Sequence, residues 1–266
     1  MSFIEKYIVE PLRYTFSDGL KLLTGILLLV FNDIVCLLLF LLFMKIGSSV
    51  FLLILLINLF VRIVVLGYYI GVIKNTLKGF DTLPNWSNIG EIVKDGILYF
   101  LALFILTILV FFPAILLSKI GSSLTMGGDI SYHTLGDINY LYTYLFNFLS
   151  SFLILTVVLI YMVMAATILW VYLPLATVNF AKKGFLGLFE VVEILKKKIS
   201  LGYIVMLILY SIVYFTVVLI LWVIGIIPVI GTAISNVYFY IFSVIYSIAF
   251  FRAVTKYFME KEGRHY

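Results

Sequence analysis

Four polar side chains interrupt two long apolar runs and are the residues best placed to do chemistry: Asn32, Asp33, Asn58 and Arg62. In a hairpin of two helices that turns near residue 47, Asp33 and Arg62 lie at similar depth, about 20 Å from the turn at about 1.5 Å per residue. An ionised side chain at that depth in hydrocarbon costs several kcal/mol unless it is paired or hydrated. We therefore expect Asp33 and Arg62 to face each other, with Asn58 four residues before Arg62 on the same helix face.

This polar cluster has two interpretations. A buried ion pair would fix the register of the hairpin, and a hydrated pair would be part of a path for a substrate or a proton. Because the sequence offers one such pair, we favour the structural interpretation.

A second candidate for chemistry is the polar stretch that holds Asp129, His133 and Asp137 at i, i+4 and i+8. On a helix these residues would share a face and could ligate a metal ion. Three nearby glycines favour a solvated loop, so we predict neither a metal nor a cofactor. The chain also lacks phosphate-binding glycine loops, nucleophile elbows and zinc-protease motifs. We therefore expect a protein that is not an enzyme.

The elements that position these residues follow from composition. Apolar residues make up 64% of the 266 residues and charged residues 12%, whereas soluble domains are nearer 45–50% and about 25%. Lipid must therefore be the solvent. Six apolar runs are long enough to span a bilayer, which takes about 20 helical residues. They predict an all-α membrane protein with spans at 20–44, 49–77, 97–117, 140–173, 201–226 and 232–257.

Basic residues predict the orientation of these spans. With the N-terminus in the cytoplasm, fifteen of the 18 Lys and Arg residues lie inside, Lys45 and Lys119 lie outside, and Arg62 lies in a span. Such a bias is typical of cytoplasmic loops. We expect a multi-pass protein of the cell membrane with both termini cytoplasmic.

The chain also repeats one pattern three times, in which an amphipathic interfacial segment precedes a helical hairpin. The interfacial segments are 2–18, 85–96 and 184–198. In the third, apolar residues at 185, 188, 189, 192 and 195 fall at helical spacing. We predict one integral membrane domain, 1–266, built of units that span roughly 1–80, 81–180 and 181–266.

Two further sets of residues have predicted roles. Gly67 and Gly71 form a G-x-x-x-G, a spacing that lets two helices approach closely, and we expect packing within the chain. Basic clusters flank the third interfacial segment and are expected to contact lipid headgroups. They are Lys182, Lys183, Lys196, Lys197 and Lys198.

The stretch GYYIGVIKNTLKGFDTLPNW resembles the signature of an archaeal multi-pass membrane family, the domain of unknown function 4013 family. The matching positions are Gly67, Tyr68, Ile73, Lys74, Asn75, Thr76, Leu77, Gly79, Asp81, Leu83 and Pro84. Family members usually carry more acidic residues after the proline, where this chain has Asn85-Trp86-Ser87-Asn88. The resemblance implies an integral membrane protein and brings no known activity.

Two functions remain open at this point. The first is a non-enzymatic scaffold that organises lipid or binds a membrane or cytoplasmic protein partner, which the interfacial segments and basic clusters favour. The second is a small transporter with a polar site near Asp33 and Arg62. Nucleic acid is not an expected partner, because the sequence has no soluble domain to present it.

Overall fold

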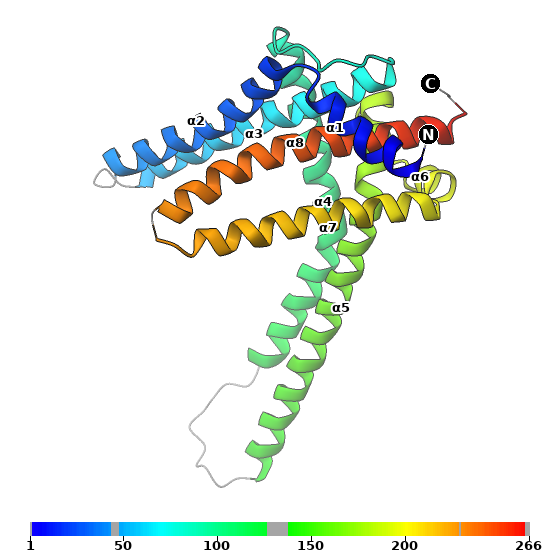
Figure 1. Cartoon of the computed structure of the whole chain (residues 1–266). Helices are drawn as coiled ribbons and strands as arrows, with labels where there is room; N and C mark the ends of the chain where they lie inside the picture. The colour runs from blue at the N-terminus through cyan, green and yellow to red at the C-terminus, as the bar shows by residue number, and fades with distance from the viewer. Residues whose placement is uncertain (1, 44–47, 127–137, 229, 264–266) are drawn as a thin grey trace. The chain divides into compact units, whose positions relative to one another are not determined.

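The computed structural model describes residues 2–43, 48–126, 138–228 and 230–263, and every regular element in this part of the chain is a helix (Figure 1). Six of these helices are long and apolar enough to cross a membrane, which confirms the predicted all-α, six-span architecture. They are α2 (Gly19–Phe43), α3 (Ser48–Leu77), α4 (Ile89–Met126), α5 (Ile138–Lys183), α7 (Leu201–Gly225) and α8 (Ile230–Lys261).

The structure forms two compact units. Unit 1 comprises Met1–Ala102 and Tyr172–Tyr266, and unit 2 comprises Leu103–Val171, the central part of the chain. Within unit 2, the Tyr161 hydroxyl of α5 donates a hydrogen bond to the Val110 carbonyl of α4 (2.5 Å). The predicted grouping into three units stays a prediction.

In unit 1, helix α8 is central. It contacts α2, α3 and α7, as well as the short helices η1 (Glu5–Val9), α1 (Glu10–Thr15) and α6 (Val191–Lys198). Figure 1 shows α8 between the α2–α3 pair and α7. Val244 and Ile248 of α8 pack in one core with Leu22 of α2 and with Tyr68 and Val72 of α3. The contacts of α2 with α3 and of α7 with α8 are those of helices that follow each other in the chain. The packing of α8 on α2 and α3 instead joins segments about 200 residues apart.

The interfacial segments differ from the expectation of three separate helices. The first is helical and consists of η1 and α1, with Tyr7 and Tyr14 buried. The second is not separate, because α4 begins at Ile89 and runs on into the span. The third is interrupted at Glu190, between η2 (Phe185–Phe189) and α6. Its continuous helical spacing is therefore broken, and Val192 is exposed while Ile194 is buried.

Helix α3 ends in a turn that sets up the signature loop, residues 78–88. Gly79 has φ +82°, a left-handed conformation that favours glycine at a helix end. Its N–H donates to Thr76 (3.0 Å), and the N–H of Phe80 donates to Asn75 (3.1 Å). This turn satisfies carbonyls at the end of α3 and directs the chain back across the ends of α1 and α8.

Candidate functional site

The signature loop is fixed by side chains that reach its backbone carbonyls from several helices. The Tyr14 hydroxyl of α1 donates to Thr82 (3.1 Å), and Lys21 Nζ of α2 donates to Leu83 (3.0 Å). From α3, the Tyr68 hydroxyl donates to Pro84 (3.3 Å) and Asn75 Nδ2 donates to Thr82 (3.3 Å). From α8, Arg252 Nη1 donates to Phe80 (2.8 Å). A backbone held at several carbonyls has little freedom, since each such hydrogen bond contributes about 0.5–1.5 kcal/mol.

Aromatic packing holds the far end of this loop. The rings of Trp86 and Tyr68 stack with centroids 3.9 Å apart and an interplanar angle of 2°. Trp86 Nε1 also donates to the Lys21 carbonyl (2.9 Å), and Leu83 is buried at 1% exposure. Tyr68 and Leu83, two residues of the family signature, thus help to join the ends of α2 and α3 to the loop.

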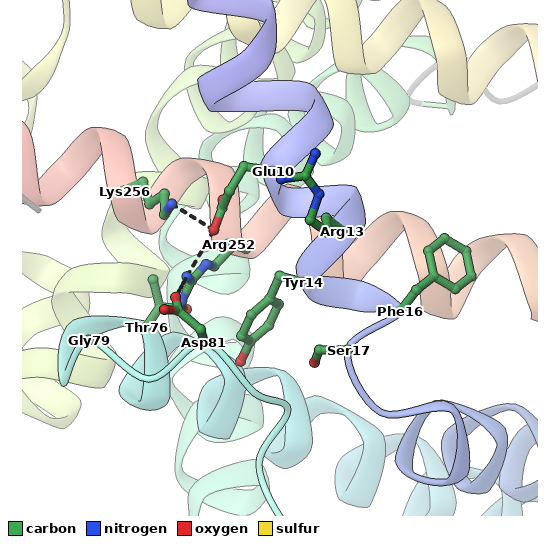
Figure 2. A pocket seen from close by; sticks show the side chains of 10 residues that line it. All are labelled: Glu10, Arg13, Tyr14, Phe16, Ser17, Thr76, Gly79, Asp81, Arg252 and Lys256. Carbon is green, nitrogen blue, oxygen red and sulfur yellow. Dashed lines mark hydrogen bonds and ion pairs between the residues drawn. The ribbon is translucent and has the colours of Figure 1, made fainter. Parts of the chain in front are cut away.

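An ionic cluster lies at the other end of the loop (Figure 2). Arg252, which is 2% exposed, forms ion pairs with Asp81 (2.6 Å) and Glu10 (3.0 Å), and Lys256 forms a third pair with Glu10 (2.7 Å). The Arg252 guanidinium also lies over the Tyr14 ring, 4.2 Å from its centroid. A buried charge persists only when it is paired and hydrogen-bonded. This cluster, which we call the Arg252 cluster, thus ties α1 and the signature loop to α8.

The Arg252 cluster forms one wall of a cavity of about 660 Å³, which lies entirely within unit 1. Burial raises the pKa of Tyr14 to about 12, although the Arg252 charge opposes that shift. Tyr14 therefore stays a neutral hydroxyl at ordinary pH and donates to the loop. Two buried atoms of the cluster, Glu10 Oε2 and Arg252 Nε, have no hydrogen-bond partner among the described residues.

Sequence reasoning missed the Arg252 cluster. Arg252 is one of the fifteen basic residues that the orientation places inside, although it falls in the apolar run 232–257. An arginine inside an apolar run is itself a signal that an acidic partner is near. The identity of that partner was not readable, because Glu10 lies 242 residues away.

The four predicted intramembrane residues lie together, but they are connected differently from the expectation. Among the described residues Asp33 and Arg62 do not form the expected direct ion pair, and both side chains instead interact with Tyr240. Asp33 accepts a hydrogen bond from the Tyr240 hydroxyl of α8 and another from Asn32 (3.3 Å). Arg62 Nε donates to Asn58 (2.6 Å). The physical reason is a third helix: α8 packs against both α2 and α3 and places Tyr240 beside the Asp33 carboxylate.

The Asp33–Tyr240 bond gives a testable prediction. In a double-mutant cycle of Asp33→Asn and Tyr240→Phe, we expect a coupling of about 1.5–3 kcal/mol in the free energy of unfolding, the range for a hydrogen bond to a charged group. Unfolding in mixed micelles of rising SDS content would measure it. The same cycle with Tyr246→Phe, another α8 tyrosine, should show no coupling. Equal coupling in the two cycles would contradict the contact.

The two glycines of the G-x-x-x-G differ in their surroundings. A Cβ on Gly67 would lie 1.8 Å from the Ile92 carbonyl oxygen of α4, and a Cβ on Gly96 would lie 2.1 Å from the Ile63 carbonyl oxygen of α3. The helices α3 and α4 therefore cross backbone to backbone at Gly67 and Gly96. A Cβ on Gly71 would meet only Pro84, at 3.7 Å. The predicted packing within the chain is found at Gly67, and its partner glycine is Gly96.

The lysines expected to contact lipid headgroups lie partly in ion pairs within the chain. Lys182 and Lys198 both bind Glu262 (2.7 and 3.0 Å), and Lys183 binds Glu190 (2.5 Å) and also Glu193. Lys196 is exposed, and the side chain of Lys197 lies outside the described residues. Headgroup contact stays a prediction for this set.

Glu262 makes the stability of this region depend on pH. Burial raises the pKa of its carboxyl, but hydrogen bonds from Lys182 and Lys198 outweigh that effect and hold the pKa below its ordinary value of 4.5. A depressed pKa stabilises the fold above the unfolded-state pKa, and this contribution is lost as the pH falls through the lower folded-state pKa.

Replacing Glu262 by glutamine should therefore destabilise the protein at pH 7 but not in acid. We expect a loss of about 1.5 kcal/mol at pH 7, the lower end for charged hydrogen bonds because Lys182 is partly exposed. When unfolding is measured from pH 7 to pH 3, the difference in unfolding free energy between the wild type and Glu262→Gln should shrink below pH 4.5. Glu91→Gln, at a largely exposed carboxyl 4.0 Å from Lys74, is the matched control with little effect. A difference that persisted at pH 3 would contradict the assignment.

Metal-binding residues do not gather in the part of the chain that the structure describes: no group of three or more His, Cys, Asp and Glu side chains there could hold an ion. The candidate set Asp129, His133 and Asp137 lies outside the described residues.

Comparison with known proteins gives a family but no activity. A family model described as "Protein of unknown function (DUF4013)" matches residues 50–230. "Uncharacterized protein MJ1189" of Methanocaldococcus jannaschii is 32% identical over 158 residues, which cover 59% of this chain and 48% of that protein. "Uncharacterized protein MJ0233" of the same organism is 31% identical over 165 residues, covering 62% and 52%.

The chain thus spans about half the length of the curated relatives it matches. No solved structure matches it. The matched residues 50–230 include the signature loop and make up more than half of the chain. With its six membrane-length helices, this multi-pass membrane protein belongs to the family of unknown function DUF4013.

Proposed function

We propose that this protein is a non-enzymatic membrane scaffold that organises lipid or holds a partner subunit around one rigid end of its helical bundle. The observation that carries the proposal is the locked signature loop. Side chains of α1, α2, α3 and α8 are all used to hold its carbonyls. Polar groups committed to backbone carbonyls support a rigid platform, whereas catalysis needs groups that are available to a substrate.

The membrane orientation is part of this proposal. The Tyr7 hydroxyl bonds to Glu260, so the N-terminal helix and the end of α8 lie at the same end of unit 1. The bias of basic residues supports a cytoplasmic location for that end in the cell membrane. A cysteine placed at the exposed position Lys78 should then react with a membrane-permeant thiol reagent in intact cells and resist an impermeant one.

Native mass spectrometry of the full chain, extracted in a mild detergent, tests the scaffold. We expect lipid or a second protein to remain bound as a discrete adduct, and the Asp33→Asn variant to retain the same adduct. A wild-type chain that carried neither lipid nor partner would overturn the scaffold proposal.

A small transporter is the second candidate, and one observation favours it. The side chains of Asp33, Tyr240, Asn58 and Arg62 gather in the middle of the spans α2, α3 and α8, and Arg62 is exposed there. Ionisable groups at this depth mark substrate or proton paths in many membrane proteins. Liposomes that contain the protein and a pH-sensitive dye test it: transport requires a flux that Asp33→Asn abolishes, whereas a scaffold gives no such flux.

A further inference from the structure

The cavity beside the Arg252 cluster has the features of a ligand site at the level of the membrane surface. It lies where three spans end, because its lining includes Ser17 just before α2, Gly79 just after α3, and Lys256 near the end of α8. Its volume of about 660 Å³ falls within the range of small-molecule pockets, about 300–1,000 Å³. Residues at this level meet lipid headgroups in a spanning protein.

The charges of the lining select for an anion. Three cations and two carboxylates line the cavity, an excess of one positive charge. Both carboxylates are already neutralised, since Glu10 binds Arg252 and Lys256, and Asp81 binds Arg252. Glu10 Oε2 keeps no donor among the described residues, so the attraction for an anion comes from the excess of one positive charge.

Two of the cations keep donors for such a ligand. The Lys256 ammonium has three N–H donors and an ion pair with Glu10 alone among the described residues. Arg13 is 74% exposed, and the one ion pair that it makes with described residues, to Glu5, is long at 3.8 Å. Figure 2 shows the Arg13 guanidinium directed away from Arg252, so binding requires it to turn toward the cavity. An exposed side chain makes that rotation at low cost.

An exposed apolar stripe leads from the cavity into the bilayer region. It begins at Phe16 on the cavity rim and continues on α2 with Leu20, Leu23 and Leu27. Leu20, Leu23 and Leu27 fall at i, i+3 and i+7 and therefore share one face of α2, whereas Phe16 lies in the turn before that helix; Leu20 is 79% exposed. A ligand with a charged head and an apolar tail fits this arrangement, with the tail along the stripe.

We propose that this cavity binds the phosphate of an anionic lipid headgroup, with Arg13 and Lys256 as its charged contacts and the lipid chains against the α2 stripe. The proposal rests on the lipid-organising role proposed above and gives that role a site. A soluble phosphate compound shares the headgroup chemistry but cannot use the stripe. Comparing the binding of the lipid with that of a soluble phosphate compound therefore shows which of the two occupies the cavity.

The test is a native mass spectrometry titration of the delipidated full chain with phosphatidylglycerol. Arg13→Gln should weaken binding about fivefold, as expected when one basic residue contributes about 1 kcal/mol near an anionic headgroup. Ser17→Asp, which adds a negative charge at the cavity rim, should weaken binding by a similar factor. This second variant tests the site if Arg13→Gln does not fold. Lys94→Gln removes an exposed lysine away from the cavity and should bind as the wild type does.

The outcomes separate the possibilities. Weaker binding in both cavity variants, with Lys94→Gln unchanged and phosphatidylcholine binding less tightly, supports the site. Equal binding in all variants overturns it. Glycerol phosphate that binds as tightly as the lipid, with the same loss in Arg13→Gln, overturns the lipid as occupant. A wild-type chain that retains lipid independently of Arg13 and Ser17 refutes only this site, whereas a chain that retains neither lipid nor partner refutes the scaffold.

Discussion

Replacing Arg252 by methionine should lower the free energy of unfolding by about 3 kcal/mol. Breaking a buried ion pair by removal of one partner costs about 3–5 kcal/mol, and the lower end applies because Lys256 still neutralises Glu10. The change also leaves the Phe80 carbonyl without its Arg252 donor. Denaturation in mixed micelles of rising SDS content, followed by circular dichroism, measures the loss.

A matched variant controls for the loss of a charge. Arg13→Met removes the same guanidinium from α1, where it is 74% exposed and holds one long ion pair. Exposed substitutions of this kind stay within about 0.5 kcal/mol. Similar small losses in both variants would show that the Arg252 cluster does not stabilise the fold.

Gly67→Ala, which adds a single methyl group, should lower the free energy of unfolding by about 3 kcal/mol, about as much as Arg252→Met. The added Cβ would lie 1.8 Å from the Ile92 carbonyl oxygen and 2.9 Å from the Gly96 nitrogen. These are backbone atoms and cannot rotate away, so α3 and α4 must separate at their crossing. Overpacking that forces backbone shifts costs about 1–3 kcal/mol and sometimes more.

Gly71→Ala is the control in the same motif, and the expected sign is opposite. Its Cβ would meet Pro84 at an ordinary 3.7 Å, and alanine is favoured over glycine within a helix by about 0.5–1 kcal/mol. Gly71→Ala should therefore be neutral or stabilising in the same SDS titration. Equal destabilisation by the two substitutions would mean that the close crossing is not at Gly67.

The intramembrane cluster shows why part of the site was predictable. Depth along a helix follows from counting residues, so the sequence placed Asp33, Asn58 and Arg62 in the same layer. Contacts also depend on rotation about each helix axis and on a third helix. Tyr240 lies 207 residues from Asp33, and no local pattern connects the two.

The signature loop shows the same division. The predicted spans 49–77 and 97–117 leave a connection here, and the structure has a turn at its start, with Gly79 in the left-handed region. The bonds that hold the loop come from Tyr14, Lys21 and Arg252, which lie on other helices. Local sequence thus located the loop, and distant residues fixed its conformation.

The sequence by itself determined that lipid surrounds this protein and where its six membrane-length helices lie. These properties depend on the hydrophobicity and the length of each segment, and both are read directly from consecutive residues. The tertiary structure alone decided that α8 is the central helix, that Arg252 meets Glu10 and Asp81, and that Gly67 meets Gly96. The physical reason is that lipid surrounds apolar side chains much as other helices do, so apolar pattern does not say which helices touch. Close packing and buried charge pairs make that choice, and both join residues that the chain order separates.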